Sequence, residues 1–103
     1  MRMTPLQIET VKSLLHRHFG ADAGVWLFGS RVRDDRKGGD YDFLVETSLD
    51  EPDVIIEHKI ALLADLLSSR PFEDEKIDLV VRRRNSAFDT PIYAVAKKEG
   101  ARL

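Results

Sequence analysis

Short β-prone segments alternate with helical patterns along this chain of 103 residues, and that alternation limits the possible folds more than any other feature. Residues 25–28, 41–45 and 77–81 are apolar runs bounded by glycine, charged residues or turns, which is typical of strands. Helical patterns cover residues 5–19, 52–67 and 91–98. The order predicts a small α/β or α+β domain in which helices flank a sheet, with a further short edge strand near residues 101–103. It leaves open whether the strands are parallel or mixed.

The first helix has the clearest start signal. Thr4 supplies an N-cap hydroxyl, Pro5 suits the first helical position, and Gln7 is spaced to close a capping box. Apolar residues then recur at steps of three and four up to Phe19, and Gly20 favours a left-handed cap. We therefore expect a helix over residues 5–19.

Length and composition indicate one domain spanning residues 1–103, because a single core is typical at roughly 100 to 150 residues. The net charge of -2 argues against a general role in nucleic-acid binding. The absence of cysteine excludes disulfides and thiolate metal sites. The polar N-terminus lacks a signal-peptide pattern, and no apolar run reaches the ~20 residues of a membrane span. We expect a cytoplasmic protein without membrane contact.

Three aspartates, Asp40, Asp42 and Asp78, lie in or beside apolar strand segments. Asp40 and Asp42 are two residues apart, so a strand places both carboxylates on one face. A neighbouring strand could bring Asp78 to that face. Converging carboxylates repel one another unless a cation lies among them, and ligation by oxygen alone suits Mg²⁺. The three residues are candidate metal ligands.

Each carboxylate also has a simpler interpretation. Asp40 follows Gly38 and Gly39 and could be an ordinary turn residue. Asp42 and Asp78 could point to water from alternating strands. The three residues together favour a site more strongly than any one of them does.

Gly29 and Ser30 directly follow the first strand. Glycine lets a phosphate approach the backbone, and the serine hydroxyl and nearby N–H groups can donate hydrogen bonds to it. A Gly-Ser pair is also a common turn. The following loop over residues 31–39 carries basic side chains that could clamp a triphosphate or form a solvated surface: Arg31, Arg33, Arg36 and Lys37.

Other polar groups carry weaker signals. The sequence predicts a polar turn at residues 46–50. Arg82, Arg83 and Arg84 could bind an anion or a partner, but a solvated strand end is the commoner explanation. Its three histidines, His16, His18 and His58, are interpreted as surface residues. Trp26 and Phe28 are interpreted as core. Apolar residues of the helix between residues 54 and 67 could be core or could contact a partner.

The segments Phe28-Gly29-Ser30-Arg31, Asp40-Tyr41-Asp42 and Ile77-Asp78-Leu79-Val80 together resemble the nucleotidyltransferase superfamily that includes DNA polymerase beta. The resemblance is closest to the minimal nucleotidyltransferases, and it implies their small mixed sheet flanked by helices. It implies that Gly29 and Ser30 hold the β- and γ-phosphates of an NTP. Asp40 and Asp42 would bind its Mg²⁺, and Asp78 would complete a second metal site and help activate the attacking hydroxyl.

The same resemblance implies transfer of NMP, with ATP as the expected donor and pyrophosphate released. Minimal members act beside a separate helical HEPN protein, so it further implies an antitoxin that adenylylates a tyrosine of a HEPN-type toxin. Gly39 departs from the serine that many members carry there, and the spacer is slightly short. Two alternatives stay open: a non-catalytic module that neutralises a HEPN partner by binding it, and a small-molecule nucleotidyltransferase of the aminoglycoside-modifying type.

Overall fold

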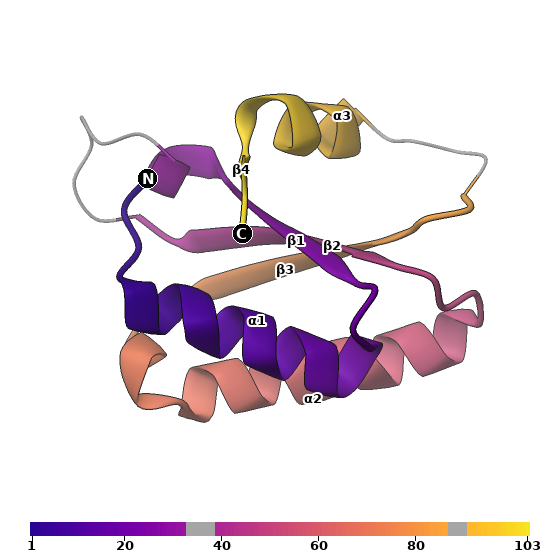
Figure 1. Ribbon diagram of the computed structural model, residues 1–103, viewed down its shortest axis with the longest axis horizontal. Coiled ribbons are helices and arrows are strands. Elements are labelled where there is room, and N and C mark those ends of the chain that lie inside the picture. The colour runs from indigo at the N-terminus through magenta and orange to yellow at the C-terminus, as the bar shows by residue number, and fades with distance from the viewer. Residues whose placement is uncertain (33–38, 87–90) are drawn as a thin grey trace.

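The computed structural model describes residues 1–32, 39–86 and 91–103, which form a mixed four-stranded sheet flanked by helices (Figure 1). This confirms the predicted fold class. The helices are α1 (Pro5–Phe19), α2 (Pro52–Ser68) and α3 (Pro91–Glu99), with 3-10 turns η1 (Gly29–Val32) and η2 (Arg70–Phe72). The strands are β1 (Gly24–Phe28), β2 (Tyr41–Thr47), β3 (Ile77–Arg83) and β4 (Ala101–Arg102).

The sheet has the strand order β3-β2-β1-β4. β1 is antiparallel to both β2 and β4, whereas β2 and β3 are parallel. A parallel pair needs a long crossover connection, and α2 supplies it here. The sheet is therefore mixed, which answers the question that the sequence left open, and the predicted edge strand near residues 101–103 is present as β4.

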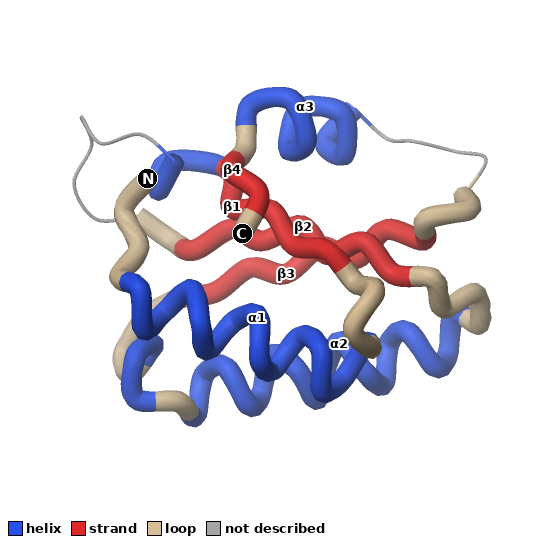
Figure 2. The backbone as a smooth tube through the Cα atoms, in the orientation of Figure 1, coloured by secondary structure: helices blue, strands red, loops and turns tan. Residues whose placement is uncertain are grey.

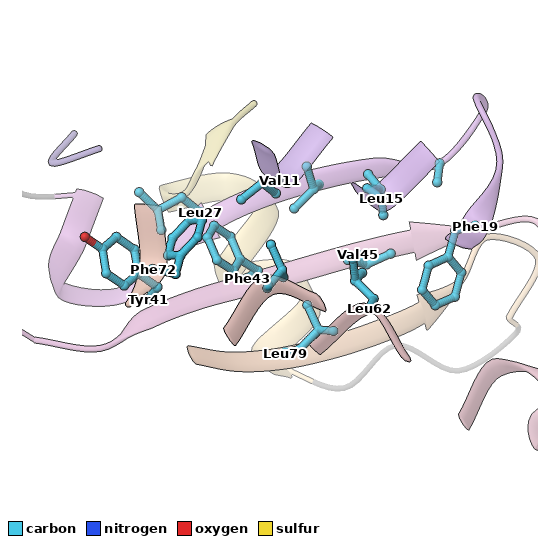
Figure 3. Close-up of a cluster of buried hydrophobic side chains, with 13 residues drawn as sticks. Val11, Leu15, Phe19, Leu27, Tyr41, Phe43, Val45, Leu62, Phe72 and Leu79 are labelled. Atoms are coloured by element: carbon cyan, nitrogen blue, oxygen red, sulfur yellow. The ribbon is translucent and has the colours of Figure 1, made fainter. Parts of the chain in front are cut away.

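The two faces of the sheet are covered unequally. Figure 2 shows α1 and α2 on one side of the strands and α3 on the other. The larger core lies against α1 and α2, and its side chains include Phe43, Val45, Leu62 and Phe72 (Figure 3). A smaller cluster of Trp26, Leu44 and Ala96 lies under α3. Odd-numbered positions of β2 thus face α1 and α2, and even-numbered positions face the α3 side.

The capping box at the start of α1 forms as predicted. The Thr4 amide donates to Oε1 of Gln7 at 2.9 Å, and the Gln7 amide donates to Oγ1 of Thr4 at 3.1 Å. The other end differs from the prediction. Gly20 has φ 91° and ψ 165°, which is an extended glycine conformation rather than the left-handed helical one. The chain turns there directly towards β1.

The polar turn predicted at residues 46–50 is wrong at its start, because β2 continues to Thr47. Glu46 is a buried strand residue whose carboxylate pairs with Lys97 at 2.9 Å and Arg82 at 3.0 Å. Arg84 also pairs with Glu46, at 3.5 Å. The interpretation of the strand end as solvated is therefore corrected for Arg82, whereas Arg83 and Arg84 are exposed. Neutralisation by nearby cations lets a glutamate occupy a buried position.

The interpretation of the histidines as surface residues also needs a correction. His18 Nε2 lies 2.6 Å from Oδ2 of Asp65, so this side chain links α1 to α2. His58 is partly buried and packs against Phe19. Trp26 and Phe28 lie in or against the smaller core, as predicted. Among the helices that the structure describes, none combines the length and apolar character needed to cross a bilayer.

Candidate active site

The end of β1 and the starts of β2 and β3 lie together along one edge of the sheet, meaning the edge where strands begin or end and not the side of an outer strand. Asp42 on β2 pairs with Asp78 on β3 in the parallel register and with Phe28 on β1 in the antiparallel register. Adjacent strands lie roughly 4.8 Å apart, and residues paired in register point to the same face. Asp42 and Asp78 are therefore neighbours on the α3 side of the sheet, and Gly29 follows Phe28 at the same edge.

This arrangement disfavours the charged form of Asp42. Its side chain is partly buried, whereas Asp40 and Asp78 are exposed. Burial raises the pKa of the Asp42 carboxyl above its ordinary value, and the negative charges of Asp78 and Asp40 raise that pKa further. The charges of Asp40 and Asp78 thus act on the Asp42 carboxyl. A cation placed among them would relieve that repulsion.

Gly29 lies against the Asp42 carboxylate. Its φ is 77°, a conformation that L side chains rarely adopt. A Cβ at this position would collide with Oδ2 of Asp42 and would lie only 3.3 Å from its Cγ. The position therefore requires glycine for two reasons, its backbone conformation and the space that the carboxylate occupies.

The remaining predicted phosphate-binding residues are only partly described. The backbone of Ser30 belongs to η1, directly after Gly29, and its side chain lies outside the described part of the chain. Arg33, Arg36 and Lys37 also lie outside the described residues. Arg31 is described, and its guanidinium lies 4.1 Å from the centre of the Tyr41 ring.

The chemistry of this edge suits a hard divalent cation, since Asp40, Asp42 and Asp78 offer only oxygen donors. Within residues 1–32, 39–86 and 91–103, no group of three or more His, Asp or Glu side chains is arranged so that it could hold a metal ion. Mg²⁺ is usually bound through one or two carboxylates together with water and substrate phosphates, rather than in an all-protein cage. The open arrangement of the carboxylates is compatible with that mode of binding.

The sequence did not reveal what anchors the start of β2. Gln7 is buried, and its Nε2 donates to the Tyr41 hydroxyl and to the Pro71 carbonyl, each at 2.9 Å. The capping box uses the other end of the same amide. The sequence did indicate that Tyr41 needs a hydrogen-bond partner. A tyrosine between two aspartates of one strand face must point to the opposite face, into the core, and its buried hydroxyl then needs a partner.

Comparison with known proteins identifies a family for this chain. The family model described as a nucleotidyltransferase domain matches residues 8–99, a range that contains the glycine turn and all three aspartates. No curated protein sequence matches the chain. Because the family match covers most of the sequence and the sheet is the mixed one expected of that fold, the chain belongs to the nucleotidyltransferase domain family.

Proposed function

We propose that this transferase moves an NMP, with ATP as its donor, to a hydroxyl acceptor in a Mg²⁺-dependent reaction. The observation that carries the proposal is the register of Asp42 beside Asp78 at the point where Gly29 leaves room for the Asp42 carboxylate. A structural role alone does not explain why two like charges should be neighbours on one face, with a third carboxylate two residues away.

Each residue has a proposed role. The backbone around Gly29 and Ser30 holds the β- and γ-phosphates, because glycine lets them approach closely and Ser30 adds a donor. Asp40 and Asp42 hold the metal that accompanies the NTP, and Asp78 completes a second position. Bound Mg²⁺ would supply positive charge that offsets the charge on the phosphates and the leaving pyrophosphate.

The proposed reaction is an in-line displacement. The acceptor oxygen forms a bond to the α-phosphorus, and the bond from that phosphorus to the pyrophosphate oxygen breaks. Asp78, exposed at the open edge of the sheet, accepts the proton of the acceptor hydroxyl. The products are the NMP ester of the acceptor and pyrophosphate, so atoms and charges balance.

The proposed acceptor is a tyrosine of a separate HEPN-type protein, with this chain as its antitoxin. Support for a protein partner comes from α2, where Ile56, Ile60 and Leu67 are 54%, 63% and 44% exposed. Steps of four and seven residues place these side chains on one side of the helix. Exposed apolar side chains along one side of a helix favour a surface that another protein covers.

The same surface also favours a second candidate function, in which the chain neutralises its partner by binding alone. The two functions differ in one respect: only the enzyme requires the aspartates. A small-molecule acceptor of the aminoglycoside type has no comparable support on the described surface.

The test is transfer of label from α-³²P-ATP with Mg²⁺ by the purified chain together with the protein encoded beside it. We expect label on a tyrosine of the partner with the unchanged chain and with Asp50→Asn, and at least a hundredfold less label with Asp42→Asn. Asp50 is exposed beyond the opposite end of β2, so it is a matched control. A stable complex without label would instead support the binding module, and label on an added aminoglycoside would support the small-molecule enzyme.

A further inference from the structure

Arg31 directly follows the Gly-Ser turn, yet its side chain is mostly enclosed. Only 14% of it is exposed. Its guanidinium lies 4.1 Å from the centre of the Tyr41 ring. Tyr41 is an odd-numbered residue of β2 and belongs to the core against α1 and α2 (Figure 3), whereas Asp42 points to the opposite face. A guanidinium stacked on that ring is turned away from the carboxylates.

The same guanidinium contacts two further segments. Its Nε donates to the Gly39 carbonyl at 3.2 Å, and its Nη2 lies 3.6 Å from Oε2 of Glu75. Gly39 immediately precedes Asp40, and Glu75 lies three residues before Asp78. Both of these described contacts of the guanidinium are therefore made to segments that lead into one of the three aspartates.

The Tyr41 ring on which the Arg31 guanidinium lies is held in place by other contacts. Its hydroxyl accepts from Gln7, and its ring packs edge-on against Phe72 with centroids 5.2 Å apart. The Tyr41 amide donates to the Lys76 carbonyl at 2.9 Å, which joins the start of β2 to the residue before β3. A planar guanidinium can stack, donate a hydrogen bond and pair with a carboxylate at once, whereas an ammonium cannot.

From these contacts we infer that Arg31 is a positioning residue: it holds the starts of β2 and β3 together so that Asp40, Asp42 and Asp78 keep their spacing, and it does not bind the triphosphate. The inference deepens the proposed function and rests on it for the identity of what the aspartates bind. It also replaces the idea that Arg31 clamps phosphate, because the described contacts of its guanidinium are made to Tyr41, Gly39 and Glu75, and the Tyr41 ring lies on the face of β2 opposite to Asp42.

The test compares Arg31→Gln and Arg31→Lys with a matched control, Arg17→Gln, which changes an exposed arginine in the last turn of α1. All assays are run at a temperature where thermal melts show each variant to be folded. For Arg31→Gln we expect the Mg²⁺ concentration for half-maximal transfer to rise about tenfold, as for other residues that orient metal ligands. The KM for ATP at saturating Mg²⁺ should stay within about twofold of the unchanged chain, because a positioning residue makes no contact with ATP.

A second readout does not depend on transfer. Exchange of the Tyr41 amide, followed by NMR, should be about tenfold faster in Arg31→Gln, because the start of β2 opens more often. Mn²⁺ affinity, measured without nucleotide by electron paramagnetic resonance, should fall by a similar factor. Arg31→Lys should give intermediate values, since it keeps the pairing with Glu75 and loses the stacking. Arg17→Gln should match the unchanged chain in every assay.

Two results would overturn the inference. A raised KM for ATP with unchanged Tyr41 exchange would make Arg31 a phosphate ligand, and unchanged Mn²⁺ affinity with unchanged exchange would leave it no role at the site. If the unchanged chain transfers no nucleotide, the proposed function fails by itself. The exchange and Mn²⁺ measurements then still decide whether Arg31 positions the carboxylates.

Discussion

Asp42 on β2 lies directly beside Asp78 on β3 in the parallel register, and both side chains point to the α3 side of the sheet. Two carboxylates at paired strand positions repel each other, and like charges placed so are destabilising. The fold tolerates this cost at an edge where Gly29 makes room for the Asp42 carboxylate. Catalytic sites commonly contain such locally unfavourable arrangements.

Asp42→Asn should make the protein more stable at neutral pH. Burial, Asp78 and Asp40 raise the pKa of Asp42 in the folded state, so the folded protein holds this proton more tightly than the unfolded chain does. Stability therefore falls as pH rises from the ordinary pKa of 3.8 through the raised value, and the penalty is complete above it. Urea unfolding at a series of pH values measures the effect.

The matched control for that experiment is Asp50→Asn, an exposed residue. The stability advantage of Asp42→Asn should shrink as the pH falls from the raised pKa towards 3.8 and be absent below 3.8, because both states then carry the proton. An Asp42→Asn variant that is less stable at pH 7, or whose advantage does not change with pH, would disprove the electrostatic description of the site.

Gly29→Ala should lower the free energy of unfolding by about 1 to 3 kcal/mol, because its φ of 77° is strained for any other residue. The added methyl group also displaces the Asp42 carboxylate, so nucleotide transfer should fall at least tenfold. Gly20→Ala is the control: its φ is 91° and it has no contact with Asp42. It should lose similar stability and keep its activity. Equal losses of activity in both variants would show that Gly29 matters only for folding.

Local signals made much of the fold predictable. Thr4, Pro5 and Gln7 determine the start of α1, which begins at the predicted residue because a capping box needs only neighbouring residues. The length of β2 was not predictable in this way. Glu46 resembles a turn residue until Lys97, 51 positions away, provides its partner.

The choice of site residues stays a prediction, and the sequence indicated only part of their geometry. The spacing of Asp40 and Asp42 already indicates one face, but the place of Asp78 depends on whether β3 is parallel to β2. That choice is made by the crossover through α2, which no local pattern encodes. For Arg31 the sequence pattern was misleading. A basic residue after a Gly-Ser turn suggests phosphate binding, and only its contact with Tyr41 indicates another role.

Glu46→Gln should destabilise the protein by about 1.5 to 3 kcal/mol at pH 7, the range for hydrogen bonds to charged groups. Only 11% of the Glu46 side chain is exposed. Burial alone would raise its pKa, but hydrogen bonding and charge from Lys97, with Arg82 and Arg84, lower the pKa overall. Its stabilising effect is therefore present above the ordinary pKa of 4.5 and is lost as pH falls through the lowered value.

Urea unfolding at pH 7 and at acidic pH tests this, with Glu57→Gln on the exposed side of α2 as the control. The control should change stability by less than about 0.5 kcal/mol. A Glu46→Gln variant as stable as the control at pH 7 would mean that the ion pairs of Glu46 with Lys97, Arg82 and Arg84 do not stabilise the fold.

Ile60→Lys should leave the chain folded, with a change in stability of less than about 0.5 kcal/mol, because the side chain is 63% exposed. It should weaken binding to the proposed partner by at least tenfold, as expected for a central apolar contact. Calorimetric titration of the partner measures this, with Lys59→Gln beside it as the control. Unchanged affinity would exclude the α2 surface as the docking site.

Calorimetric binding of a non-hydrolysable ATP analogue with Mg²⁺ to the unchanged chain, Asp42→Asn and Asp50→Asn tests the proposed site directly. We expect Mg²⁺-dependent binding by the unchanged chain and by Asp50→Asn, and at least a tenfold loss of affinity for Asp42→Asn despite its greater stability. Equal affinity in all three proteins, or binding that does not depend on Mg²⁺, would contradict a metal–nucleotide site at Asp40, Asp42 and Asp78.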